Sequence, residues 1–118
     1  AAQQLWLGIR EQTHPHFAAG LPLWRLSLPS TAAPLGDADP QLIEWGGALR
    51  WLRTARPAAE LRAQAQQLGG HATLFRGPGP RQDVFTPLSA PLLAIHRRLR
   101  AQFDPDGLFD AGRLVQGL

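Results

Sequence analysis

Short apolar segments, each closed by proline or glycine, constrain the fold of this chain more than any other feature of its sequence. Residues 23–28 alternate, with Trp24, Leu26 and Leu28 on one side and other residues between them, and Pro29 ends the run. A period of two is typical of a β-strand with one buried face. Because one strand cannot bury that face alone, the sequence predicts a sheet built from several short strands.

A hairpin is predicted in the middle of the chain. Residues 41–45 and 48–53 read as strands, and Gly46-Gly47 separates them. Tight hairpin turns need backbone conformations with positive φ, which glycine adopts without steric cost. The two segments are therefore predicted to pair as adjacent antiparallel strands.

A helix and a fourth strand follow the hairpin. Pro57 suits the first turn of a helix, and Gly69-Gly70 supplies its end before the short strand of residues 71–76. The order strand, loop, hairpin, helix, strand predicts an α+β fold, namely a ferredoxin-like antiparallel sheet of about four strands with helices on one face. The other face must then meet solvent, a partner or another domain.

Two further helices are predicted near the ends of the chain. The apolar residues of 3–13 keep roughly helical spacing, and His14-Pro15 ends that segment because the residue before proline avoids the helical region. Ser89 is placed to cap a C-terminal helix, and Asp104-Pro105 closes it before a tail. One face of that helix carries an apolar stripe, which predicts burial with the histidine as an ordinary core residue. The stripe consists of Leu88, Leu92, Ile95, His96, Leu99 and Phe103.

Composition excludes several classes of protein. The chain of 118 residues is predicted to form one domain, residues 1–118, and its 44% hydrophobic content favours a packed core over disorder. It has no cysteine, which removes disulfides and thiol chemistry, and no apolar run long enough to span a membrane. All 12 basic residues are arginine, which we interpret as biased composition and not as a sign of nucleic-acid binding. The chain also lacks methionine, so we expect a piece cut from a longer protein.

No self-contained catalytic set is present in the sequence. It has no glycine-rich dinucleotide or phosphate loop, no nucleophile elbow and no zinc-deaminase signature. His14 and His16 would need a further ligand to hold a metal, so a polar helix exit is the simpler interpretation and no metal site is predicted. We therefore expect the chain alone to be inactive as an enzyme.

Arginine on the predicted strands is the best candidate for binding a small anion. Alternation puts Arg25 on the side of its strand away from Trp24, and it puts Arg50 away from Trp51 in the same way. A guanidinium offers two parallel N–H donors that match the two oxygens of a carboxylate. Arg25 and Arg50 are therefore predicted to bind a carboxylate substrate. The alternative is that each arginine stacks on tryptophan or pairs with Glu44.

The C-terminal segment carries a recognisable motif. Residues 103–113 read F-D-P-D-G-L-F-D-A-G-R, which resembles the C-terminal end of FAD-linked oxidases of the vanillyl-alcohol-oxidase type, F-D-P-x-G-x-[FL]-N-P-G-[RK]. Residues 23–31, 43–52 and 69–76 resemble segments of the FAD-binding E-type subunit of bacterial glycolate oxidases, in the same order. The resemblance spans residues 6–113, nearly the whole chain.

This resemblance implies a function. It implies that the chain is the C-terminal cap domain of a subunit that oxidises glycolate to glyoxylate, with FAD as the hydride acceptor and with most of the FAD site in a preceding domain. The implied partners are a related flavoprotein subunit and an iron–sulfur subunit, with no nucleic acid. The implied location is cytoplasmic, with the complex able to attach to the inner membrane.

The resemblance also implies which residues lie near the flavin. Asp110, Gly112 and Arg113 match the family's asparagine, glycine and terminal cation, so they are the expected cofactor-binding residues. Asp110 departs from the family pattern, because a carboxylate cannot donate an amide N–H. We expect the tail to lie against the domain with Leu108 and Phe109 buried, since burial of such side chains contributes ~1.5–3 kcal/mol each.

A different class of function is also compatible with the predicted fold. A ferredoxin-like sheet with exposed aromatics is the architecture of RNA-recognition motifs, in which bases stack on strand side chains. The nearest stretch here, residues 72–76, lacks the aromatic signature of such motifs. The alternative interpretation is a non-catalytic interaction or RNA-binding module.

Overall fold

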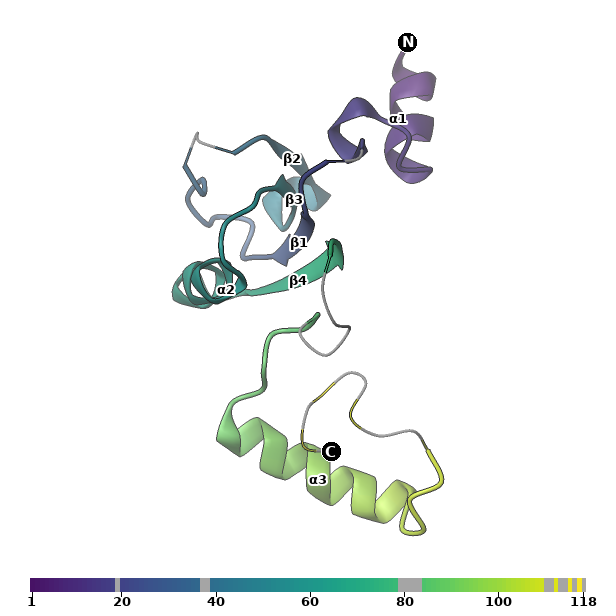
Figure 1. Cartoon of the computed structure of the whole chain (residues 1–118), viewed down its shortest axis with the longest axis vertical. Helices are drawn as coiled ribbons and strands as arrows, with labels where there is room; N and C mark the ends of the chain where they lie inside the picture. Colours follow the sequence, from purple (N-terminus) through teal and green to yellow (C-terminus); the bar gives the residue numbers. More distant parts are fainter. Residues whose placement is uncertain are drawn as a thin grey trace. The chain divides into compact units, whose positions relative to one another are not determined.

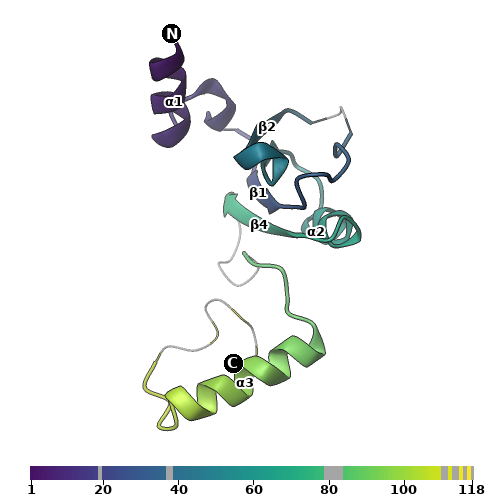
Figure 2. The same ribbon diagram turned by 180° about the vertical axis from the view of Figure 1, so that it is seen from behind.

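The computed structural model describes residues 1–18, 20–36, 39–78, 84–109, 112, 115 and 117. The chain divides into two compact units, Ala1–Pro78 and Gly79–Leu118. That residues 1–118 form one domain stays a prediction. Figures 1 and 2 show the elements of both units from opposite sides. None of the helices in the described part of the chain is long and apolar enough to cross a membrane.

A four-stranded antiparallel sheet forms the centre of the first unit. Its strands are β1 (Leu23–Ser27), β2 (Gln41–Glu44), β3 (Leu49–Arg53) and β4 (His71–Arg76), in the order β2-β3-β1-β4. β3 pairs with both β1 and β2, and β1 also pairs with β4. This order and these directions confirm the predicted α+β fold with a ferredoxin-like sheet (Figure 1).

The turn between β2 and β3 confirms the predicted hairpin. It is formed by the short 3-10 helix η2 (Trp45–Gly47). Gly46 and Gly47 have φ angles of 59° and 99°, and a Cβ on Gly47 would lie 2.8 Å from the carbonyl oxygen of Ser30. Positive φ and this close approach explain why glycine is needed here. Trp45 also has a positive φ, and its side chain is 81% exposed.

Two α-helices belong to the first unit, α1 (Ala2–Arg10) and α2 (Ala58–Gln67). α1 ends earlier than the apolar spacing predicted, and the short 3-10 helix η1 (Pro15–Phe17) follows it. α2 follows Pro57 as expected, but Pro57 is the N-cap of the helix and does not lie in its first turn. It lies beside β4 in both views of the molecule (Figures 1 and 2).

One face of the sheet carries the main core of the first unit. Side chains that lie directly opposite each other in an antiparallel pair share a face, and Leu26 lies opposite Arg50 and Ala72. Leu61 and Ala65 of α2 are fully buried in the cluster on this side, which we call the covered face. The cluster consists of Trp24, Leu26, Leu28, Leu35, Leu52, Leu61, Ala65 and Ala72.

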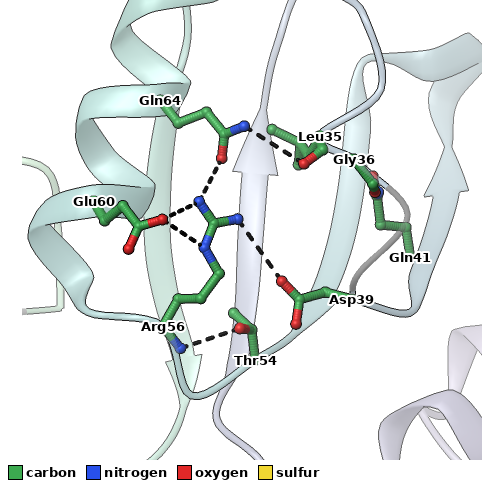
Figure 3. Close-up of polar contacts among 8 residues, drawn as sticks. All are labelled: Leu35, Gly36, Asp39, Gln41, Thr54, Arg56, Glu60 and Gln64. Carbon is green, nitrogen blue, oxygen red and sulfur yellow. Dashed lines mark hydrogen bonds and ion pairs between the residues drawn. The ribbon is translucent and has the colours of Figure 1, made fainter.

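A loop stands between β1 and β2 in place of a full crossover helix, and it packs into this core through Leu35. Arg56 links the loop to α2. Its guanidinium donates to Glu60 at 2.6 Å and to Gln64 at 3.0 Å (Figure 3). The same guanidinium lies 3.7 Å from the carboxylate of Asp39 in the loop, and the Gln64 amide donates to the carbonyl oxygen of Leu35 at 3.5 Å. These contacts make the loop part of the layer that covers the sheet.

The second unit contains the helix α3 (Ala90–Phe103). No residue of α3 is buried, and Ile95, His96 and Phe103 are exposed. The predicted buried stripe, with His96 as a core residue, is therefore wrong for this structure. Ser89 precedes the helix as predicted, but its side chain makes no capping hydrogen bond.

Asp104 shapes the turn after α3. Its carboxylate accepts hydrogen bonds from the backbone N–H groups of Leu108 at 2.6 Å and Phe109 at 3.2 Å. Leu108 and Phe109 are 82% and 73% exposed, so the prediction that they are buried is wrong. The two side chains stay exposed because the Asp104 carboxylate holds only their backbone N–H groups, and this does not bring the side chains into a core.

Candidate functional site

The face of the sheet opposite the covered face is the candidate site, and we call it the open face. Arg25 of β1 lies directly opposite Trp51 of β3 and Thr73 of β4, so these side chains share a face. Phe17 of η1 packs against one part of it. The open face comprises Leu23, Arg25, Ser27, Leu42, Glu44, Leu49, Trp51, Arg53, His71, Thr73 and Phe75.

Arg25 stands on an inner strand, at the centre of the open face. The residue is partly buried, and no hydrogen bond or ion pair joins its guanidinium to another described residue. Its planar fork can therefore receive a carboxylate without breaking an existing contact. This geometry supports the prediction that Arg25 faces a carboxylate substrate.

Arg50 lies on the covered face, as the register of β1 with β3 shows. It is 3% exposed, and its guanidinium donates to the backbone carbonyl oxygens of Ala32 at 2.5 Å, Ala33 at 2.7 Å and Gly47 at 3.2 Å. These bonds hold the loop after β1 and the hairpin turn. Arg50 therefore lies on the face of the sheet opposite Arg25, and its donors are already used, which leaves Arg25 as the better candidate of the two for a carboxylate.

An aromatic cluster borders Arg25 on the open face. Trp51 is 6% exposed, and its ring makes edge-to-face contacts with Phe17 and Phe75, with centroids 5.5 and 5.0 Å away. The indole Nε1–H donates to Glu44 Oε2 at 2.6 Å. Phe75 is 44% exposed, so its ring forms the accessible part of the cluster. A ligand bound at Arg25 would therefore have an apolar wall beside it.

Polar side chains lie beside Arg25 along β1 and β4. Thr73 is directly opposite it, and Ser27 is two residues further along β1, opposite His71. All three carry groups that can form hydrogen bonds with a small hydroxy acid. Sequence reasoning missed them, because the alternation of one strand does not show which residues of a distant strand share its face.

A hydrogen bond of His16 connects η1 to β3 of the sheet. Its Nε2 lies 3.1 Å from the carbonyl oxygen of Trp51, so the neutral ring can donate from that nitrogen. Burial lowers the pKa of His16 below 6.5, and the charges of Arg53 and His14 act in the same direction, against the opposing effect of the hydrogen bond. Within the described ranges, no group of three or more His, Cys, Asp or Glu residues is placed to hold a metal ion.

A hollow of about 290 Å³ lies at the end of the open face where β1 begins. Its walls include Phe17, Leu21 and Leu23, and Arg76 is the charged residue among those that line it. The guanidinium of Arg76 already donates to Gln12 Oε1. We therefore regard the hollow as a weaker anion site than the surface around Arg25.

The residues predicted to lie near a flavin belong to the C-terminal tail. Asp110 and Arg113 lie outside the described residues. Gly112 is exposed and has a φ of 84°. The role of these three residues in cofactor binding thus stays a prediction from the resemblance.

Comparison with known proteins tests the resemblance along the whole chain. Over 118 residues, 99% of its length, the chain is 46% identical to glycolate oxidase subunit GlcE of Escherichia coli (strain K12). The chain spans 33% of the length of that protein. No family model and no solved structure matches the chain. The identity to GlcE confirms the resemblance to the E-type subunit of bacterial glycolate oxidases that the sequence motifs indicated.

Proposed function

We propose that this chain forms the substrate-side cap of a flavoprotein subunit, and that the whole enzyme oxidises glycolate to glyoxylate with FAD as the hydride acceptor. The observation that carries the proposal is Arg25, a partly buried guanidinium on the open face with no hydrogen bond or ion pair to another described residue. The 46% identity to a glycolate oxidase subunit supports the choice of substrate.

Glycolate needs one charged contact for its carboxylate and polar contacts for its hydroxyl. Arg25 would bind the two carboxylate oxygens through parallel N–H donors, which is the strongest arrangement available to an arginine. Thr73 and Ser27 would offer hydroxyl groups beside that carboxylate. Phe75, supported by Trp51, would keep water away from one side of the substrate.

The described residues fit a cap over a flavin site better than a complete FAD site. They include no glycine-rich loop that could hold the phosphates, whereas the open face offers an aromatic wall and a cation. When bound, FAD supplies the hydride acceptor for the oxidation. The rest of a longer protein would bind the nucleotide part of FAD, while this chain binds and orients the substrate.

We further propose that the full-length subunit works in a complex. The similar protein from Escherichia coli is named as a subunit of glycolate oxidase, which supports this view. A related flavoprotein subunit and an iron–sulfur subunit would pass the electrons on toward quinone, in the cytoplasm or at the inner membrane. Co-purification of the full-length protein with such subunits tests the assembly, and its isolation as a lone active protein would contradict it.

The open face gives less support to an RNA-binding module. Bases in such modules stack on exposed aromatics of the central strands. Here the aromatic residue of the open face on an inner strand is Trp51, which is 6% exposed and contacts both Phe17 and Phe75. The exposed Phe75 lies on the edge strand β4. If the chain were a non-catalytic interaction module, substitution of Arg25 would leave glycolate turnover unchanged, in contrast to our proposal.

Replacement of Arg25 in the full-length oxidase complex tests the proposal. Arg25→Ala should cost ~2–5 kcal/mol of transition-state binding, which is a loss of roughly 30- to 5,000-fold in kcat/KM for glycolate. Arg25→Lys should retain part of the activity, because an ammonium keeps the charge but loses the planar fork. Arg98→Ala, on the exposed surface of α3, is the matched control. Equal kinetics of Arg25→Ala and the control, in folded complexes, would reject Arg25 as the carboxylate site.

A further inference from the structure

We infer that Glu44 is a positioning residue of this site: its carboxylate fixes the indole of Trp51, and through it the exposed ring of Phe75, beside Arg25. The inference rests on the proposed function, because it takes Arg25 as the group that receives the substrate carboxylate. It goes beyond that function because Glu44 would shape the site without touching the substrate, by holding Trp51 and Phe75 in place.

The contact between Glu44 and Trp51 joins β2 to β3. Glu44 ends β2 opposite Leu49, and Trp51 lies two residues further along β3. The indole Nε1–H donates to Glu44 Oε2 at 2.6 Å, and a hydrogen bond to an ionised acceptor is shorter and stronger than one between neutral groups. Because an indole has a single N–H, this bond determines which edge of the ring faces β2.

Two edge-to-face contacts continue from Trp51 across the open face. Its ring meets Phe17 at 85° and Phe75 at 81°. Such contacts depend on the relative rotation of the rings, since the positive edge of one ring meets the negative face of the other. A turned indole would therefore displace Phe75, which is the most exposed of the three rings.

The position of this wall makes it relevant to the substrate. Trp51 lies directly opposite Arg25, and Phe75 follows two residues after Thr73, the other cross-strand neighbour of Arg25. The rings and the guanidinium therefore border the same part of the open face. Displacement of the wall would let water reach a carboxylate bound at Arg25, and water weakens the attraction between the two charges.

Removing the acceptor has a defined consequence. Trp51 is buried, so an indole N–H without a partner is unfavourable there and the ring should turn toward water. Glu44→Gln keeps a side-chain oxygen that can accept the same hydrogen bond. Glu44→Met has a similar length and no oxygen. Comparison of these two variants separates the hydrogen bond from the space that the side chain fills.

Indole resonances of the ¹⁵N-labelled 118-residue chain test the inference with glycolate as the probe. The resonance of Trp51, identified by its loss in Trp51→Phe, should be protected from solvent exchange and should shift when glycolate is added. The indole of Trp45, which is 81% exposed, gives an unprotected reference. We expect Glu44→Met to lose the protection and to weaken glycolate binding about tenfold or more.

Matched variants complete the experiment. Glu44→Gln should restore the protection and most of the affinity. Glu11→Ala removes an exposed carboxylate that forms an ion pair with Arg10, and it should change neither quantity. If Glu44→Met fails to fold, Trp51→Phe removes the N–H but keeps an aromatic ring, and its affinity is followed through the backbone resonance of Thr73. Unchanged glycolate affinity in that variant overturns the inference.

Two other results would also overturn it. One is loss of the indole protection in Glu44→Met with glycolate affinity equal to that of the parent, because Glu44 would then only stabilise the sheet. The other is a Trp51 resonance that glycolate leaves unmoved in the parent chain. Either result leaves the proposed function standing, since the kinetics of Arg25→Ala in the full-length complex decide that function independently.

Discussion

Replacement of Arg50 with alanine should destabilise this chain strongly. Arg50 is 3% exposed, and its guanidinium donates to the carbonyl oxygens of Ala32, Ala33 and Gly47. A hydrogen bond to a charged group contributes ~1.5–3 kcal/mol, so three such bonds give an upper bound of about 5–9 kcal/mol. The variant no longer has to bury a cation, and the freed loop can return its carbonyl groups to water. We therefore expect a net loss of about 3–4 kcal/mol.

A loss of this size would be a large share of the stability of a small domain, which is typically ~5–15 kcal/mol. Arg50→Lys should lose roughly half as much, about 2 kcal/mol, because one ammonium cannot reach carbonyl oxygens on two segments with the geometry of a guanidinium. Arg98→Ala, at an exposed position of α3, should stay within about 0.5 kcal/mol of the parent.

Urea unfolding followed by tryptophan fluorescence measures these differences. The midpoint should fall in the order parent, Arg50→Lys, Arg50→Ala, with little change in the slope m, because the same surface is exposed on unfolding. Hydrogen exchange of the amides around residues 32–33 should rise in the alanine variant, since those residues lose their anchor. A loss below about 1 kcal/mol for Arg50→Ala would refute the reasoning, because the guanidinium would then not hold the loop.

Three further predictions concern His16, Gly70 and Phe109. Because burial lowers the pKa of His16 below 6.5, its contribution to stability is present above pH 6.5 and is lost as the pH falls through the folded pKa. His16→Gln should therefore make the urea midpoint less dependent on pH in that window, and an unchanged pH dependence would contradict this. Gly70→Ala should lower the unfolding free energy in urea by about 3 kcal/mol or more, since its Cβ would lie 2.0 Å from the carbonyl oxygen of Ser27. A parental midpoint would show that the connection between α2 and β4 can move away from Ser27 without cost. Phe109→Ser should change the unfolding free energy by less than about 0.5 kcal/mol, because the ring is 73% exposed, and a larger loss would mean that the ring packs in solution.

Much of the first unit follows from local patterns in the sequence. Alternation at Trp24 and Leu26 predicted a strand with one buried face, and both side chains lie in the core of the covered face. Gly46-Gly47 predicted the hairpin because a tight turn needs positive φ. Such features depend on residues a few positions apart, so the sequence alone is sufficient to predict them.

Contacts between distant segments do not follow from such patterns. The guanidinium of Arg50 binds the carbonyl oxygens of residues 32–33, and every residue has a carbonyl oxygen, so nothing in the sequence distinguishes these two. The bond from Trp51 to Glu44 likewise depends on the register of two strands. The apolar character of Phe109 predicted burial, but it did not show whether the chain supplies a core for that ring.

Arg25 and Arg50 lie one residue apart in register on neighbouring strands, because Arg50 is directly opposite Leu26. A period of two therefore sends the two guanidinium groups to opposite faces of the sheet. On the covered face the loop after β1 provides two carbonyl oxygens for Arg50 and the hairpin turn provides a third, as a buried charge requires. On the open face no described residue forms a hydrogen bond or ion pair with Arg25, although that residue is also partly buried. A partly buried cation with unused donors favours an anion from outside the sheet, and a carboxylate matches its planar fork, so the same register that makes Arg50 structural leaves Arg25 for a ligand.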